Sequence, residues 1–233
     1  LLWSYLAGRA YGFSLLASFL LGIAYITAFS GRLISDPMVA NGIFLLPWLF
    51  YAFAKAIKDG KGSWKRWLWS GVGGIGIGWA FLASFSQIVI YDIFIFAIFV
   101  LLHFLFVFSG KKNLASFVFY ASVLIIMAAV GFLIAAPHIL PALKFTPLTF
   151  RAEQLPYDVA TIKSVGPGDL IGFLFPAFSY FPYLSPGLKY LYVGAFWFFL
   201  AVTGIFYKFR SKVVNIFAAL FGFVFISSLK WSP

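Results

Sequence analysis

The sequence contains seven apolar runs that approach the length needed to cross a lipid bilayer, and this pattern constrains the fold more than any other feature. A transmembrane helix takes about 20 apolar residues. The runs cover roughly residues 12–30, 39–57, 67–85, 88–108, 114–136, 189–207 and 213–229. Only Ser86 and Gln87 separate the third run from the fourth, which predicts an antiparallel helical hairpin, with one very long helix as the alternative. We therefore expect an all-α, polytopic membrane bundle of about seven transmembrane helices, in a single domain over residues 1–233.

The composition supports this interpretation and excludes several classes of protein. Hydrophobic residues make up 63% of the chain and charged residues only 10%, too few charges to cover a soluble globule of 233 residues. Disordered chains are poor in apolar and aromatic residues, so this class is excluded as well. The chain has no cysteine, which excludes disulfides and cysteine-ligated metals. The net charge of +11 does not predict nucleic-acid binding, because the charges lie in short clusters between apolar runs.

The basic clusters indicate an orientation in the membrane. Eleven of the 17 basic residues lie before the first run or in and around the second, fourth and sixth connections, which must share one side if seven helices cross. These residues are Arg9, Lys55, Lys58, Lys61, Lys65, Arg66, Lys111, Lys112, Lys208, Arg210 and Lys212. The positive-inside rule makes that side cytoplasmic. We expect a multi-pass protein of the bacterial cytoplasmic membrane, with short basic loops inside.

The connection over residues 137–188 is longer than the others and would lie outside. It holds eight of the eleven prolines and many aromatic residues. A loop of this length is either functional or disordered, and disordered segments are poor in aromatics. We expect an ordered outer loop with short helices at His138–Phe145, with Pro141 in its first turn, and at Gly168–Phe175.

The third run contains a glycine-rich stretch, Gly71 to Gly78, that formally matches a dinucleotide-binding fingerprint. Such a site needs a strand before it and a βαβ unit, and neither is predicted here. The same stretch contains a small-residue pattern that lets helices pack closely in lipid. We therefore predict helix packing and no nucleotide cofactor site.

Asp92 lies inside the fourth run, near its outer end, and is a candidate catalytic residue. A carboxylate inside a membrane helix costs roughly 2.5–3.5 kcal/mol and often has a function. A paired or surface-facing carboxylate is the alternative. Gln87 lies one turn before Asp92, on the same face or in the turn, where its amide could bind a sugar hydroxyl or cap the hairpin. His103 lies about 16 Å further along a helix and is expected to pack near the cytoplasmic side.

Other candidate residues lie in the outer connections. Asp36 precedes Pro37, which is typical of a helix start, with a catalytic role as the alternative. Arg32 could pair with Asp36 or contact an anion. His138 is expected to start a helix or contact substrate, since no second histidine lies near enough in the sequence to predict zinc.

Arg151 and Glu153 form the most suggestive pair in the long loop. Arginine binds phosphate through two parallel hydrogen bonds, in a way that lysine cannot match. Glu153 could orient Arg151, bind a sugar hydroxyl or hold a divalent metal. A solvated ion pair of small energetic value is the alternative. We predict no defined metal site and leave the cofactor open.

Taken in order, several stretches resemble the bacterial YfhO-like membrane proteins, which belong with the GT-C type of glycosyltransferase. The stretches are Ser30-Gly31-Arg32 with Asp36-Pro37 and Leu46-Pro47-Trp48-Leu49; Phe81 to Gln87; Ala135 to Leu143 running into Thr146-Pro147-Leu148 and Arg151; and Gly168-Asp169-Leu170-Ile171 with Phe175-Pro176 and Tyr192-Val193-Gly194. The terminal Lys230-Trp231-Ser232-Pro233 resembles a stretch that precedes another outer loop in the family. The resemblance covers nearly the whole chain.

The resemblance implies transfer of a sugar from a polyprenyl-phosphate donor to a cell-envelope glycan or lipid acceptor, outside the membrane. It implies that Arg151 contacts the lipid phosphate, with Glu153, Gln87, Asp36 and His138 near sugar. GT-C enzymes usually carry an acidic catalytic residue in the first outer loop, and the resemblance implies that this sequence starts after that loop. We therefore expect an internal piece of a longer protein from which the catalytic loop is missing. A transporter or flippase for a lipid-linked glycan and a non-catalytic membrane scaffold are the alternatives.

Overall fold

The computed structural model describes residues 1–35, 42–58, 63–84, 86–107, 114–149, 195–207 and 211–228, and these ranges are helical apart from short connections. The helices are α1 (Leu2–Ala10), α2 (Leu15–Ser35), α4 (Leu45–Lys58), α5 (Trp64–Ala83), α6 (Ser86–Val107), α7 (Leu114–Phe145), α9 (Ala195–Tyr207) and α10 (Lys212–Ser228), with a 3₁₀ turn at Thr146–Leu148. The predicted all-α class is confirmed for the described part of the chain.

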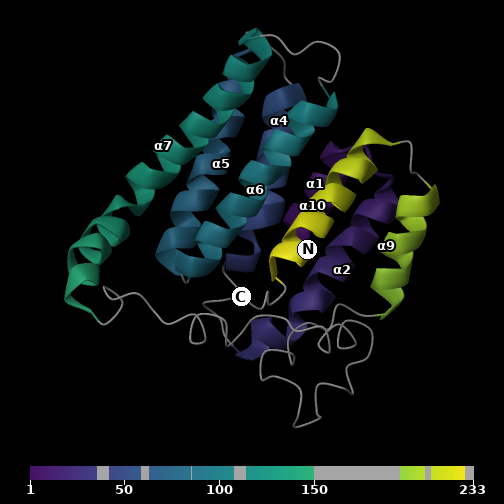
Figure 1. Ribbon diagram of the computed structural model, residues 1–233, viewed down its shortest axis with the longest axis horizontal. Coiled ribbons are helices and arrows are strands. Elements are labelled where there is room, and N and C mark those ends of the chain that lie inside the picture. The colour runs from purple at the N-terminus through teal and green to yellow at the C-terminus, as the bar shows by residue number, and fades with distance from the viewer. Residues whose placement is uncertain are drawn as a thin grey trace.

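Consecutive helices run in alternating directions, so that their ends collect at two ends of a bundle (Figure 1). The end of α1, the end of α4 and the starts of α5, α7 and α10 meet at one end, which we call the basic end. The end of α2, the starts of α4 and α6 and the end of α7 meet at the other, which we call the Asp92 end after the residue discussed below. This alternation is the arrangement that the sequence requires for its basic clusters to share a side.

The centre of the bundle is packed with apolar and aromatic side chains. On α4, buried residues recur at the helical spacing of one face, from Leu45 through Leu49 and Phe53 to Ala56. Phe53 stands edge-on to Phe96 and Phe99 of α6, with ring centroids 5.7 and 6.0 Å apart. Many large apolar side chains nevertheless remain exposed on the outside, including Leu114 at 77% and Leu133 at 72%. Such a surface is suited to an apolar surrounding.

Helices α5 and α7 pack closely because glycines line their contact, and the prediction of helix packing for this stretch is confirmed. A Cβ atom at Gly74 would lie 2.7 Å from the main-chain oxygen of Met127, and one at Gly78 would lie 2.5 Å from Cβ of Ile134. Gly131 of α7 approaches α5 equally closely, with Ile77 as its neighbour. Only residues without a side chain allow the two backbones this near to each other. We call this contact the glycine seam.

The helix is interrupted between α5 and α6. The predicted hairpin of two helices is therefore confirmed, and the alternative of one long helix is wrong. Ser84 ends α5 in an extended conformation, with φ −136° and ψ 173°. Helix α6 then begins at Ser86. Ser86 and Gln87 therefore belong to the first turn of α6 and do not form the turn itself.

The prediction of a separate short helix at His138–Phe145 is wrong, because α7 continues without interruption through these residues. It includes both Pro137 and Pro141. Each proline removes one main-chain hydrogen bond, and their spacing of four residues places both losses along one exposed stripe of the helix. The rest of the hydrogen-bond ladder can hold the helix together, as it does in membrane helices that contain proline. Sequence rules for helix starts therefore placed a boundary where none exists.

Two of the described helices are long and apolar enough to cross a membrane, namely α6 over Ser86–Val107 and the segment Leu114–Leu148 that contains α7. Leu15–Thr27 and Lys212–Val224 are shorter apolar helical stretches. Helix α1, which the sequence analysis did not predict, packs against α2 and α4. The predicted helix at Gly168–Phe175 lies outside the described residues.

Candidate functional site

Asp92 lies on the inward face of α6, toward the interior of the bundle. The buried residues of α6 recur at Val89, Phe96, Phe99 and His103, and Asp92 falls three residues after the first and four before the second. It therefore shares their stripe. Its Oδ2 atom is buried and has no hydrogen-bond partner among the residues that the structure describes. A buried carboxylate oxygen without a partner costs free energy, and a carboxylate inside an apolar bundle is a candidate functional residue.

Tyr25 of α2 is the polar neighbour of Asp92. The two side chains interact electrostatically. The Tyr25 hydroxyl donates a hydrogen bond of 2.6 Å to the main-chain oxygen of Ile43, just before α4. This bond fixes the tyrosine at the Asp92 end of the bundle. Asp92 and Tyr25 thus place a carboxylate and a phenol within electrostatic range of each other in a mostly apolar bundle.

Two further polar pairs surround the first turn of α6. The Ser86 Oγ and the His138 Nε2 of α7 lie 3.4 Å apart, which joins α6 to α7. The Gln87 amide donates to the Tyr91 hydroxyl at 3.1 Å. Gln87 and His138 are both exposed. They form an accessible polar rim at the same end of α6 as Asp92, with Gln87 turned away from the inward face on which Asp92 lies.

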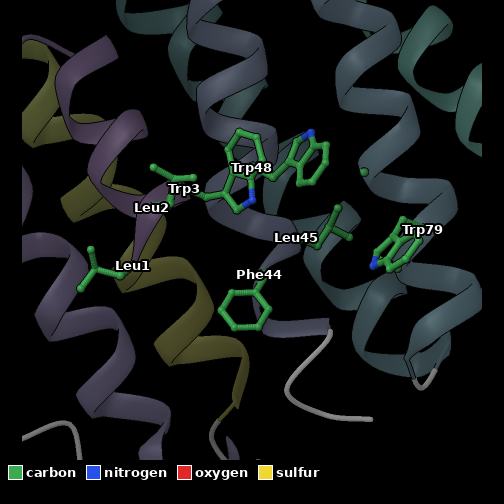
Figure 2. Close-up of a pocket in the computed structure, with 9 residues that line it drawn as sticks. Leu1, Leu2, Trp3, Phe44, Leu45, Trp48 and Trp79 are labelled. Atoms are coloured by element: carbon green, nitrogen blue, oxygen red, sulfur yellow. The ribbon is translucent and has the colours of Figure 1, made fainter. Parts of the chain in front are cut away.

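An apolar pocket of about 330 Å³ opens between α1, α4 and α5 (Figure 2). Its lining residues are Leu1, Leu2, Trp3, Phe44, Leu45, Trp48, Gly76, Trp79 and Ala80. The rings of Trp3 and Trp48 lie against each other with centroids 4.2 Å apart, and Leu45 lies between them and Trp79 (Figure 2). The Trp48 indole N–H donates to the main-chain oxygen of Val72 at 2.9 Å, so this donor is already used.

The segment Gly42–Leu45 connects the pocket with the polar residues. Phe44 and Leu45 line the pocket, and the preceding Ile43 accepts the hydrogen bond from Tyr25. Gly42 lies directly against α6, because a Cβ atom there would be 2.9 Å from Cγ2 of Ile88. The Asp92 end therefore combines an apolar pocket, a buried carboxylate and a polar rim around one short segment.

The structure brings together some of the predicted site residues and not others. Asp92, Gln87 and His138 all lie at one end of α6, but the expectation that Gln87 shares a face with Asp92 is not met. The expectation that His138 starts a helix is wrong, because this residue lies inside α7. Arg32 belongs to α2, but its side chain is outside the described part, and Asp36, Arg151 and Glu153 lie outside the described residues.

His103 packs away from Asp92, as predicted, toward the other end of α6. Its Nδ1 and the Tyr120 hydroxyl of α7 are hydrogen-bonded at 3.0 Å. Its ring stands edge-on to Phe53 with centroids 5.5 Å apart. In the parts of the chain that the structure describes, no three His, Asp or Glu side chains come together in a way that could hold a metal ion.

Sequence reasoning missed Tyr25 and the tryptophans of the pocket. A tyrosine inside an apolar run needs a partner for its hydroxyl, and this signal could have indicated Tyr25. The pocket had no such signal, since Trp3, Trp48 and Trp79 come from different helices and tryptophan is common at membrane surfaces. Comparison of the chain with protein-family models, with curated proteins and with solved structures gives no match.

Proposed function

We propose that this chain is part of a membrane glycosyltransferase that moves a sugar from a polyprenyl-phosphate donor to an acceptor in the cell envelope, on the outer face of the membrane. The observation that carries the proposal is Asp92, whose buried Oδ2 has no partner among the described residues. It lies at the end of the bundle that the positive-inside rule would place outside. The resemblance to YfhO-like proteins supplies the reaction class.

The proposed arrangement in the membrane has α2, α4, α5, α6, α7, α9 and α10 as the seven crossing helices. The basic residues of the described helices support this orientation: Arg9, Lys55, Lys58, Lys65, Arg66 and Lys212 belong to turns at the basic end, and Arg32 and Lys144 to helix turns at the other. The basic end would face the cytoplasm of a bacterium. The long connection that follows α7 would then lie outside.

In the proposed reaction, Asp92 is the base in place of the first-loop acid that the resemblance implies, and its carboxylate accepts the proton of an acceptor hydroxyl. The oxygen forms a bond to the anomeric carbon of the sugar, the bond from that carbon to the phosphate oxygen breaks, and polyprenyl phosphate leaves with the electron pair. General base catalysis of this kind contributes typically 10²–10⁴-fold to a rate. The apolar pocket offers space for part of an isoprenoid chain, and Arg151 is the proposed contact of the donor phosphate.

A transporter for the same lipid-linked glycan is supported less well. Transporters bind substrate at helices that are broken near the middle of the membrane. Proline and clustered glycines can break helices, so Pro47 and the glycines of the third run are the places where such breaks could occur. In the structure, Pro47 lies in the first turn of α4 and α5 is continuous through its glycines.

The test compares envelope glycans in a strain that lacks the gene, complemented with the wild-type protein, with Asp92→Asn or with Tyr120→Phe. We expect mass spectrometry to show a glycan that is lost with the gene, is restored by the wild type and Tyr120→Phe, and stays absent with Asp92→Asn at equal protein level. Tyr120→Phe is the matched control, because it removes one polar group from the described bundle at a distance from Asp92. An unchanged glycan profile in the strain without the gene would overturn the proposal.

Arg151→Ala tests the donor contact separately. Transfer should be abolished if Arg151 holds the donor phosphate, and unchanged transfer at normal protein level would remove this residue from the proposed site. If the gene is needed for the glycan but Asp92→Asn restores it fully, the reaction class stands and Asp92 is not its base. A scaffold would require the protein but tolerate both substitutions.

A further inference from the structure

The basic end of the bundle carries a second surface that glycosyl transfer does not use. It consists of the last turn of α4 and the first turn of α5, with Lys55, Lys58, Lys65 and Arg66, and we call it the α4–α5 basic surface. Lys61 and Asp59 lie between these turns, outside the described residues. Asp59 is the only acidic residue in this part of the sequence, so the surface keeps a strong positive charge.

Aromatic rings hold two of these cations in place. The Lys55 ammonium lies 5.8 Å from the centroid of the Tyr51 ring and 5.7 Å from that of the Trp69 ring. The Arg66 guanidinium carbon lies 3.7 Å from the centroid of Trp67 and 5.0 Å from that of Phe119 in α7. Cation–π contacts of this kind fix the position of a cation without neutralising it. Both charges therefore remain available to an anion.

Arg66 also has an unused donor. Its Nε atom is buried and has no hydrogen-bond partner among the described residues. A buried donor without a partner is costly, and stacking leaves the edge of the guanidinium group open for hydrogen bonds to oxygen atoms. Charge and fixed geometry together fit a phosphate group.

The surrounding side chains indicate that a phosphate bound at this surface would belong to a lipid. Trp64 is 67% exposed and Trp67 42% exposed, next to the cations on the first turn of α5. Indole rings at such a position prefer the region between lipid headgroups and acyl chains. Clusters of four to eight basic residues beside a transmembrane helix attract anionic lipids.

We propose that the α4–α5 basic surface is a binding site for the phosphate headgroup of an anionic phospholipid. Arg66 contacts the phosphate, Lys55, Lys58 and Lys65 add attraction, and Trp64 and Trp67 pack against the upper acyl chains. The site requires that these helices lie in a membrane, but it does not depend on glycosyl transfer. Its role goes beyond setting orientation, because orientation requires the charges only during insertion.

The experiment titrates the purified protein in neutral detergent with phosphatidylglycerol or phosphatidylcholine and counts bound lipids by native mass spectrometry. We expect the first phosphatidylglycerol to bind at least about fivefold more tightly than the first phosphatidylcholine, because one surface cation is worth roughly that factor. Arg66→Gln and the exposed Lys65→Gln should each reduce the affinity for phosphatidylglycerol about fivefold. Lys65→Gln keeps the test valid if Arg66→Gln does not fold.

Lys212→Gln is the matched control, because it removes one positive charge from the start of α10 at the same end of the bundle. Its affinity for phosphatidylglycerol should match that of the wild type. An equal loss in Lys212→Gln and Arg66→Gln would overturn the proposal in favour of general attraction by net charge. Displacement of phosphatidylglycerol by inorganic phosphate would show an anion site without lipid specificity, and equal wild-type affinity for the two lipids would show no site.

Discussion

Helix α6 carries two polar residues on the same inward stripe, and they differ in how the bundle accommodates them. His103 is hydrogen-bonded to Tyr120 and enclosed by aromatic rings such as that of Phe53. Asp92 has a buried oxygen without a partner among the described residues and interacts electrostatically with Tyr25. The same face of the same helix thus has one polar group whose partner is visible and one whose partner is not.

The difference teaches how a structural polar group can be distinguished from a functional one in an apolar bundle. Polar contacts between membrane helices are worth only about 0.6 kcal/mol on average. A partnered histidine is therefore sufficiently explained by helix packing. A carboxylate whose buried oxygen has no partner among the described residues is not, because its insertion costs several times as much as such a contact returns. The following predictions test this distinction, in order of decreasing effect.

The largest effect is expected for Asp92→Asn on sugar transfer. If Asp92 is the base, the rate of transfer by the purified protein should fall at least about 100-fold, which corresponds to about 2.7 kcal/mol. The free energy of unfolding should stay the same or rise, since a buried charge is removed. Radiolabelled sugar transfer and unfolding by sodium dodecyl sulfate in mixed micelles measure the two quantities. A large loss of stability with little loss of transfer would make Asp92 a structural residue like His103.

The second effect concerns the glycine seam, which holds the helix that carries Tyr120. Gly74→Ala should lower the free energy of unfolding by about 1–3 kcal/mol, because the new methyl group would meet the main-chain oxygen of Met127. Gly71→Ala is the matched control on the same helix. A Cβ atom there has no neighbour within 4 Å, so this change should be neutral or stabilising by up to about 1 kcal/mol. Equal effects of the two substitutions in the micelle assay would contradict the close contact of α5 and α7.

The glycine seam also shows how far sequence reasoning reached. Small residues at helical spacing have few other uses in a membrane helix, so the stretch from Gly71 to Gly78 predicted packing before any partner was known. The apolar runs predicted the helices for the same reason, since each one depends on local composition. The sequence did not predict which helices pack against each other, because contacts such as those of Met127 with Gly74 join residues far apart in the sequence.

The candidate site was only partly predictable. Asp92 stood out because a carboxylate is rare inside a membrane helix. The sequence could not show whether Asp92 faces inward or outward. Helix α6 is apolar on all sides and so has no amphipathic pattern that would identify its buried face. Proline rules failed at Pro137, because the remaining main-chain hydrogen bonds of α7 keep it helical in spite of two missing ones.

A third prediction compares the two tyrosines that accompany the polar residues of α6. Tyr25→Phe and Tyr120→Phe each remove one hydroxyl group that is hydrogen-bonded, to Ile43 and to His103 respectively. Each should lower the free energy of unfolding by about 1 kcal/mol. Only Tyr25→Phe should also reduce transfer, because Tyr25 interacts electrostatically with Asp92. If Tyr120→Phe reduced transfer per folded molecule to the same degree, the division of α6 into a structural and a functional half would fail.

The smallest effect is the coupling between His103 and Tyr120 themselves. A double-mutant cycle with His103→Leu and Tyr120→Phe isolates the energy of their contact, provided that neither substitution creates a new one. We expect a coupling of about 0.6 kcal/mol, the average for polar contacts between membrane helices. A parallel cycle with Asp92→Leu and Tyr25→Phe should give a smaller or opposite coupling, because the Tyr25 hydroxyl donates to Ile43 and Asp92 Oδ2 has no described partner. A larger coupling for Asp92 and Tyr25 than for His103 and Tyr120 would mean that the carboxylate stabilises the folded bundle through Tyr25. Asp92 would then be explained as a structural residue, and its proposed catalytic role would lose its physical basis.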